Sequence, residues 1–170
     1  RIGEGALKDE AQYTLIDMAL GEQNDQRLKA IVDKIAGDVA QAGSMRTRYA
    51  VGKALLRLER YIEAISLLSG LLKSGEYQHK ARFYIATAKT ALKRYKEAAE
   101  DFKALTTLEG ANTAEIRYLS MLALGRLRLE QGDLDQAAIA YQLIPRRSAY
   151  YEVALYEMSW GYIKAEQYDR

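Results

Sequence analysis

The chain has 170 residues, of which 49% are hydrophobic and 28% are charged, a composition that suits a folded protein rather than a disordered one. Its 25 basic and 23 acidic residues leave a net charge of +2, without the basic surplus that an electrostatic nucleic-acid binder needs. The absence of cysteine excludes disulfides, thiolate metal ligands and cysteine nucleophiles.

Residues 1–44 are predicted to form an irregular helical hairpin. Tyr13, Ile16 and Leu20 share one face of its first helix. The pattern breaks before Asp25, which we predict to be the N-cap of the second helix. An apolar stripe follows, with spacings of three and four, formed by Leu28, Ile31, Val32, Ile35 and Val39. Terminal repeats commonly depart from their consensus where one face meets water, so we interpret this hairpin as a degenerate first repeat or cap.

From Met45 onward two amphipathic helices and a turn recur. The turn between the two helices holds Tyr61, Tyr95, Leu134 and Tyr168. These positions are separated by 34, 39 and 34 residues, and a period of about 34 is typical of paired-helix repeats. The longer spacing indicates an insertion around residues 108–115, where Gly110, Ala111, Asn112 and Thr113 predict a lengthened loop.

Small and large residues keep the same register. The first helix of each unit holds a small residue at Gly52, Ala86, Gly125 and Ser159. Three residues after the turn position comes alanine, at Ala64, Ala98 and Ala137. Large apolar residues follow at Leu68, Phe102 and Tyr141, and then at Leu71, Leu105 and Ile144. Glycine inside a helix costs about 1 kcal/mol relative to alanine, so we interpret the small residues as sites of close helix crossing.

These positions together resemble the tetratricopeptide repeat (TPR) family over about 125 residues, from Met45 to the end. The resemblance implies an all-α fold, a TPR-like α-solenoid of stacked antiparallel helix pairs that winds into a right-handed superhelix. It divides the chain into an N-terminal hairpin (1–44), units at 45–78 and 79–112, an insertion loop or helix extension (113–117), a third unit (118–151) and the first helix of a fourth (152–170). The sequence departs from the family where tryptophan is common, at Arg48, Arg82, Met121 and Leu155.

A finer resemblance lies in residues 144–169. Pro145 is expected to stop one helix and Ser148 to cap the next, and paired tyrosines follow. This segment resembles bacterial envelope TPR proteins, including periplasmic adaptors of motility, outer-membrane assembly and Tol–Pal type systems. It implies a location in the periplasm or envelope, with the cytoplasm as the alternative. The sequence lacks an initial methionine and ends inside a predicted repeat, so we expect a fragment whose leader or anchor lies elsewhere.

The sequence shows little that points to catalysis. His79 is the one histidine, and its polar surroundings at a predicted repeat junction favour a solvated or capping role. Gly3 and Gly5 lack the strand and lysine of a phosphate-binding loop. We therefore expect no enzyme activity, cofactor or metal. No apolar run approaches the roughly 18 residues of a membrane span, so we expect no membrane insertion by this chain.

In the TPR family the first helices of the units line a concave groove. The matching positions here are Arg46, Tyr49, Lys53, Lys80, Phe83, Tyr84, Thr87, Leu119, Leu122, Arg126, Val153, Tyr156 and Trp160. Such a groove is basic and aromatic at one end and apolar at the other. Because arginine and aromatic residues are frequent binding anchors, it suits an acidic or amphipathic segment of a protein partner. The absence of asparagine from these positions disfavours the carboxylate clamp of chaperone adaptors.

Three hypotheses remain open. The first is a protein-binding scaffold within a bacterial envelope complex. The second is a structural spacer or oligomerisation segment of a larger protein, with self-association through the open C-terminal repeat. The third, RNA binding by a helical repeat, requires a basic groove with polar reading positions, which the apolar residues Leu119, Leu122 and Trp160 disfavour. The basic cluster also fits a solvated face, and the tyrosines also fit a packed seam.

Overall fold

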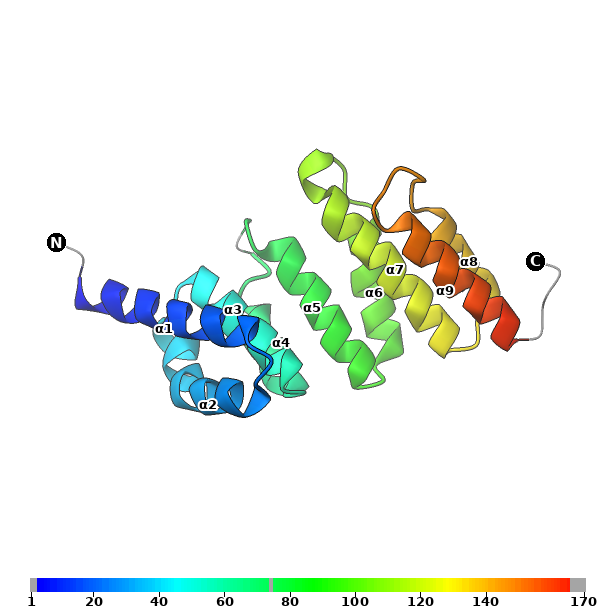
Figure 1. Ribbon diagram of the computed structural model, residues 1–170. Helices are drawn as coiled ribbons and strands as arrows, with labels where there is room; N and C mark the ends of the chain where they lie inside the picture. Colours follow the sequence, from blue (N-terminus) through cyan, green and yellow to red (C-terminus); the bar gives the residue numbers. More distant parts are fainter. Residues whose placement is uncertain (1–2, 74, 166–170) are drawn as a thin grey trace. The chain divides into compact units, whose positions relative to one another are not determined.

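The computed structural model describes residues 3–73 and 75–165. Within these ranges the regular structure is helical, without a β-strand (Figure 1). The chain divides into two compact units, Arg1–Leu92 and Lys93–Arg170, and each is described by itself.

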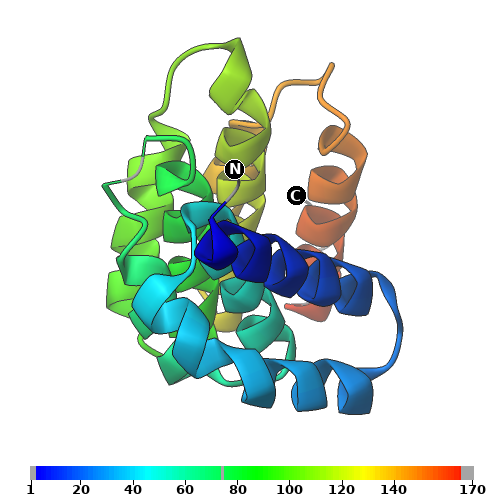
Figure 2. The same cartoon turned by 90° about the vertical axis from the view of Figure 1, so that its left-hand side faces the viewer.

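Unit 1 is built from helix pairs joined by short turns. Its helices are α1 (Glu4–Gly21), α2 (Asp25–Ala42), α3 (Met45–Arg57), α4 (Tyr61–Ser69) and α5 (Gln78–Ala91). Helix α1 packs against both α2 and α3, and α4 packs against both α3 and α5. Figure 2 shows α1 and α2 as the dark-blue and light-blue helices of one hairpin. The first helices of the successive pairs, α1, α3 and α5, are also neighbours through α1–α3 and α3–α5 contacts.

The starts of α2 and α3 are set by side-chain caps. The Asn24 side chain accepts a hydrogen bond from the backbone N–H of Arg27 at 3.0 Å. The predicted cap Asp25 is instead the first helical residue, so that prediction is wrong by one position. The Ser44 hydroxyl accepts from the Thr47 N–H at 3.2 Å and begins α3. These contacts satisfy backbone donors that the first turn of a helix leaves without partners.

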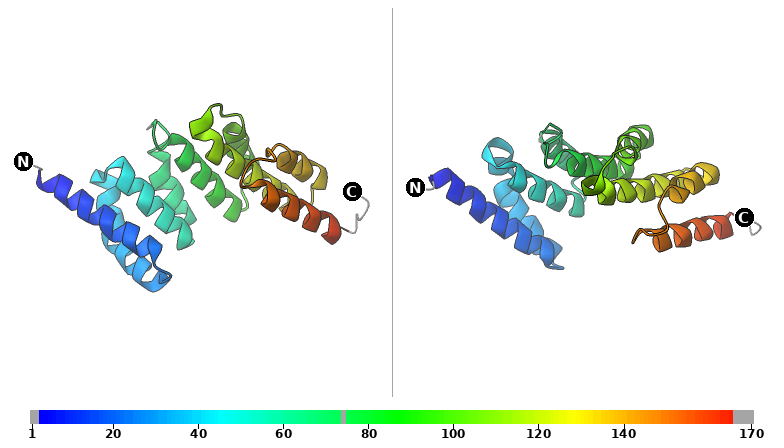
Figure 3. Two further views of the ribbon diagram at one scale, coloured as in Figure 1. Left: turned by 45° about the horizontal axis from the view of Figure 1, so that its top comes forward. Right: turned by 90° about the horizontal axis from the view of Figure 1, so that it is seen from above.

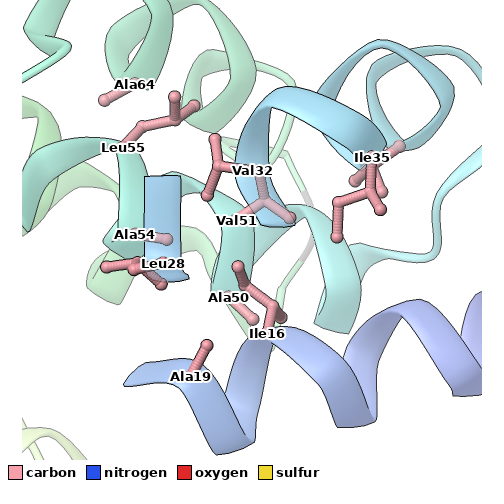
Figure 4. Packing of buried hydrophobic residues seen from close by; sticks show 11 residues of the cluster. Ile16, Ala19, Leu28, Val32, Ile35, Ala50, Val51, Ala54, Leu55 and Ala64 are labelled. Atoms are coloured by element: carbon pink, nitrogen blue, oxygen red, sulfur yellow. The ribbon is translucent and has the colours of Figure 1, made fainter. Parts of the chain in front are cut away.

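The core of unit 1 joins the first three helices (Figure 4). Ile16 of α1, Leu28 and Val32 of α2, and Val51 and Leu55 of α3 are each at most 2% exposed. The predicted stripes on both helices of the first hairpin are therefore confirmed, with Tyr13, Leu20 and Ile31 partly buried at the edge of this core. The hairpin at residues 1–44 packs its apolar faces on the next helix pair, as expected for helices that cannot bury those faces alone.

Unit 2 contains α6 (Tyr95–Thr106), a short 3₁₀ helix η1 (Ala111–Thr113), α7 (Ala114–Glu130), α8 (Leu134–Gln142) and α9 (Tyr151–Lys164). Helix α7 packs against α6 and α8, and α8 packs against α9 (Figure 3). The lengthened loop is found before α7, where the Arg117 guanidinium donates to the Leu108 carbonyl at 2.6 Å. The large apolar positions of this unit, Phe102, Leu105, Tyr141 and Ile144, are at most 2% exposed.

The turn positions identified by their spacing begin the second helix of each pair. Tyr61, Tyr95 and Leu134 are the first residues of α4, α6 and α8, whereas Tyr168 lies outside the described residues. The alanines three residues later, Ala64, Ala98 and Ala137, are at most 1% exposed. The fold class is therefore all-α, with stacked antiparallel helix pairs of the α-solenoid type, as the sequence predicts. The unit boundaries drawn from the repeat register stay a prediction.

Candidate protein-binding surfaces

An aromatic surface covers one side of α1, α3 and α5 in unit 1. Its members are Tyr13, Arg46, Tyr49, Tyr77, Phe83 and Tyr84, and we call this set the aromatic surface. The Tyr49 ring lies 5.2 Å from the Tyr77 ring and 5.8 Å from the Tyr84 ring, centroid to centroid. The Phe83 and Tyr84 rings meet edge to face at 5.6 Å. These separations and tilted orientations are those that aromatic pairs prefer.

Arg46 joins this surface to α1. Its guanidinium carbon lies 3.4 Å from the centroid of the Tyr13 ring, and a guanidinium nitrogen is 3.5 Å from the Glu10 carboxylate. Hydrogen bonding with Tyr13 raises the pKa of Arg46 above its usual value, so the side chain stays charged. Burial, with the charge of Glu76, raises the pKa of Tyr77, and its hydroxyl stays protonated at neutral pH. The surface therefore presents phenol rings and a fixed cation.

Two lysines lie on the helices that carry these rings, Lys53 on α3 and Lys80 on α5. The ammonium of Lys53 is 5.8 Å from the Tyr49 ring centroid, within the range of a cation–π contact. Lys80 is exposed near the start of α5. Thr87 is also exposed, and its hydroxyl donates to the Phe83 carbonyl at 3.0 Å. The predicted groove residues of this unit therefore lie on neighbouring helices, and their contact with a partner stays a prediction.

Tyr13 and Tyr77 belong to the aromatic surface although they were not among the predicted groove residues. Tyr77 is the N-cap of α5, a position that apolar periodicity does not identify. Tyr13 shares the apolar face of α1, which indicated packing rather than exposure, and it is half-buried. Arg46 and Tyr13 lie on different helices and far apart in the sequence, so their contact cannot be inferred from sequence proximity.

In unit 2, Arg126 is already paired. It forms a two-pronged interaction with the Glu157 carboxylate of α9, with Nε 2.9 Å from Oε2. The Tyr141 hydroxyl donates to the same carboxylate at 3.1 Å. The hydrogen bond with Glu157 raises the pKa of Arg126, and burial together with that negative charge raises the pKa of Tyr141. Arg126 therefore ties α7 to α9 within the unit.

Leu122 does not line an open surface, contrary to the sequence-based prediction. It is 3% exposed and packs in the core of unit 2 with Met121 and Tyr141. Leu119 is half-buried. The reason is that the core cluster around Leu122 joins α7 to α8 and to Ala154 of α9, so its side chain points into the packed interior of the unit.

Helix α9 carries an exposed apolar stripe. Its residues are Val153, Tyr156, Trp160 and Ile163, exposed by 40%, 71%, 58% and 50%. Their spacings of three, four and three place them along one face of the helix. The stripe includes the three predicted groove residues of this helix. The predicted groove residues thus fall in both units: unit 1 holds Arg46, Tyr49, Lys53, Lys80, Phe83, Tyr84 and Thr87, and unit 2 holds Leu119, Leu122, Arg126, Val153, Tyr156 and Trp160.

No group of three or more histidine and acidic residues in the described ranges is placed to hold a metal ion. His79 lies half-buried in the first turn of α5. Among the helices that the structure describes, none has the length and apolar character needed to cross a membrane.

Comparison with known proteins gives similarity to solved structures. No family model and no curated protein matches the sequence. The chain is similar to the apo form of the quorum sensor NprR from B. thuringiensis, with a TM-score of 0.48 and 14% sequence identity. The match covers 94% of this chain and 60% of that chain, so this chain spans less than two thirds of the other protein's length.

Proposed function

We propose that this chain is a non-enzymatic scaffold of the TPR type that binds a segment of a partner protein. The observation that carries the proposal is the aromatic surface, which extends over three neighbouring helices of unit 1. Its rings are half-buried and therefore keep an accessible face. Rigid aromatic side chains beside cations are favourable binding anchors because they lose little conformational entropy and combine apolar contact with charge.

The charges on this surface favour an acidic or amphipathic segment. The Lys53 ammonium lies beside the Tyr49 ring, Lys80 is exposed on α5, and the Arg46 side chain stays 50% exposed despite its contacts with Tyr13 and Glu10. A carboxylate of the partner would lie near these cations while its apolar side chains contact Tyr49 and Tyr84. Neither nucleic acid nor a membrane is required by this chemistry.

The setting that we propose is a bacterial envelope complex, with the chain in the periplasm or attached to the envelope. This proposal rests on the resemblance of residues 144–169 to envelope TPR proteins. The cytoplasm is the alternative location. Fractionation of the source cells, followed by detection of the native protein, distinguishes the two.

A second candidate function is a structural spacer or oligomerisation segment. It is favoured by the α9 stripe, where Tyr156 is 71% and Trp160 is 58% exposed. Exposed aromatic side chains of this size commonly mark a surface that another polypeptide covers. Self-association through this helix would appear as a concentration-dependent increase in mass, which Trp160→Ser would remove.

Photo-crosslinking tests the main proposal. A photoreactive residue is placed at Thr87, beside the aromatic surface, or at the control position Ile62, which is 73% exposed on α4. In source cells, Thr87 should crosslink to a specific protein and Ile62 should not. Equal crosslinking from both positions, or none from Thr87, would contradict a partner on this surface.

Charge reversal then tests the chemistry. We expect Lys53→Glu with Lys80→Glu to abolish the Thr87 crosslink without lowering the melting temperature. The matched control is Lys34→Glu with Lys73→Glu, which makes the same charge change at exposed positions of unit 1. Arg46 is left intact because its reversal would also break the stack on Tyr13.

A further inference from the structure

Unit 2 contains a groove that the aromatic surface and the α9 stripe do not use. It lies between α6 and α8, is floored by α7 and has a volume of about 500 Å³. We call it the α6–α8 groove. The packing of α7 against both walls builds it within one compact unit.

The α8 wall is apolar. Ile139 and Leu143 are 51% and 56% exposed, and their spacing of four places them on one side of the helix. Leu124 contributes apolar surface from the floor. Together these side chains form a strip on which a second apolar helix face can pack.

The α6 wall and the floor are cationic. Lys96 and Lys103 lie seven residues apart, two turns or about 10 Å along the helix. Arg128 adds a third cation from the floor, and Glu100 is the one carboxylate among the lining residues that the structure describes. At one end the Tyr95 hydroxyl donates to the Glu130 carboxylate at 2.6 Å, which joins α6 to α7 and holds this wall in place.

We propose that the α6–α8 groove binds an acidic amphipathic helix of a partner protein. An apolar face on that helix packs against Ile139 and Leu143, and acidic residues along its edge face Lys96 and Lys103. This pairing of an apolar strip with a parallel cationic wall selects a helix whose own apolar and acidic sides are adjacent. The α8 helix has nine residues, so it can lie along about two and a half turns of such a helix, roughly 14 Å.

A synthetic peptide provides the probe. It carries leucines at helical spacing on one face and glutamates along the adjacent edge, and a matched peptide has lysine in place of every glutamate. Binding to the isotope-labelled chain is followed by NMR. We expect the acidic peptide to shift the amide signals of α6 and α8 and to bind there more weakly at higher ionic strength.

Variants separate the contributions of the two walls. Lys96→Glu with Lys103→Glu should weaken binding roughly tenfold, equivalent to about 1.4 kcal/mol. The matched control, Arg146→Glu with Arg147→Glu, changes the same charge in an exposed loop and should leave the affinity unchanged. Ile139→Ser with Leu143→Ser should weaken binding without lowering the melting temperature, because both side chains are more than half exposed.

Several results would overturn the proposal. Equal binding of the lysine peptide would show that charge does not contribute to recognition. Absence of binding by the acidic peptide would show that the groove is not a binding site for such a helix. Signal changes confined to α9 or unit 1 would place the peptide elsewhere. A dimer of the chain alone that disappears in the Ile139→Ser, Leu143→Ser variant would assign the groove to a second copy. None of these results alters the Thr87 crosslink, so the groove and the aromatic surface are tested independently.

Discussion

Leu68 packs onto the backbone of Gly52 so closely that a β-carbon added at position 52 would lie 2.4 Å from Leu68 Cδ2. The same relationship recurs in unit 2, where a β-carbon at Gly125 would lie 2.5 Å from Tyr141 Cε1. In each case the large residue follows the glycine by 16 positions and lies on the second helix of the pair. The repeated small residue therefore has a physical cause, which is the close crossing of two helices.

Substitution of these glycines by alanine should destabilise the fold. Gly52→Ala forces Leu68 away from α3, and Gly125→Ala forces the buried Tyr141 ring away from α7. Overpacking of this kind costs about 1–3 kcal/mol, less the helix propensity that alanine gains. Chemical denaturation of each variant measures the change in the free energy of unfolding.

Gly37→Ala is the matched control. Gly37 lies within α2, and no neighbouring atom lies within 4 Å of an added β-carbon. Alanine should therefore stabilise the chain there by up to about 1 kcal/mol. A stabilising effect of Gly52→Ala equal to that of Gly37→Ala would contradict the close-crossing explanation.

The register of small and large residues made the helix pairs predictable from the sequence. The spacing of Ala64 and Leu68 from the turn position recurs along the chain, and this recurrence predicts that both side chains are buried. Contacts between side chains on different helices could not be predicted in this way. The pairing of Arg126 with Glu157 depends on how α7 and α9 are placed, and the contact of Arg46 with Tyr13 crosses between pairs. The burial of Leu122 has the same origin, since it depends on the packing around α7.

The cap of α2 gives a second prediction. Asn24→Ala removes the acceptor for the Arg27 N–H and should cost about 1 kcal/mol. Asp25→Ala removes an exposed ion pair with Arg57 and should cost at most about 0.5 kcal/mol. The melting temperatures of the two variants, measured by thermal unfolding, show which substitution costs more stability. A larger loss of stability for Asp25→Ala would indicate that Asp25 is the N-cap of α2, as the sequence suggested.

Ionisation of Asp9 should make the stability of the fold depend on pH in the acidic range. Its carboxylate accepts a hydrogen bond from the Ser44 N–H at 2.8 Å, which links α1 to the cap of α3. Burial alone would raise the pKa of Asp9, but hydrogen bonds from Ser44 and Thr47 outweigh burial and lower it. Because the folded pKa is lowered, the stabilisation is present above the unfolded value of about 3.9 and is lost as pH falls through the folded pKa.

Asp9→Asn tests this dependence. At pH 7 the variant should be less stable by about 1 kcal/mol, because a charge-assisted hydrogen bond is replaced by a neutral one. The difference should close as the pH is lowered below about 3.9. Asp17→Asn, a change at an exposed position of the same helix, serves as the control and should show no such convergence. A gap that is independent of pH would exclude ionisation of Asp9 as its source.

Tyr141 should make unit 2 sensitive to alkali. Burial and the adjacent Glu157 charge raise the pKa of its phenol, so the folded chain holds this proton more tightly than the unfolded chain does. The resulting stability is complete below the unfolded pKa of about 10 and declines as the pH rises above it.

Tyr141→Phe should therefore lose the hydrogen bond to Glu157, at a cost of about 1 kcal/mol near neutral pH, and show a shallower decline in alkali. The comparison is Tyr156→Phe, whose ring is 71% exposed and whose alkaline decline should match that of the unmodified chain. Equal slopes for Tyr141→Phe and Tyr156→Phe in denaturation curves above pH ~10 would show that ionisation of Tyr141 is not what weakens the fold.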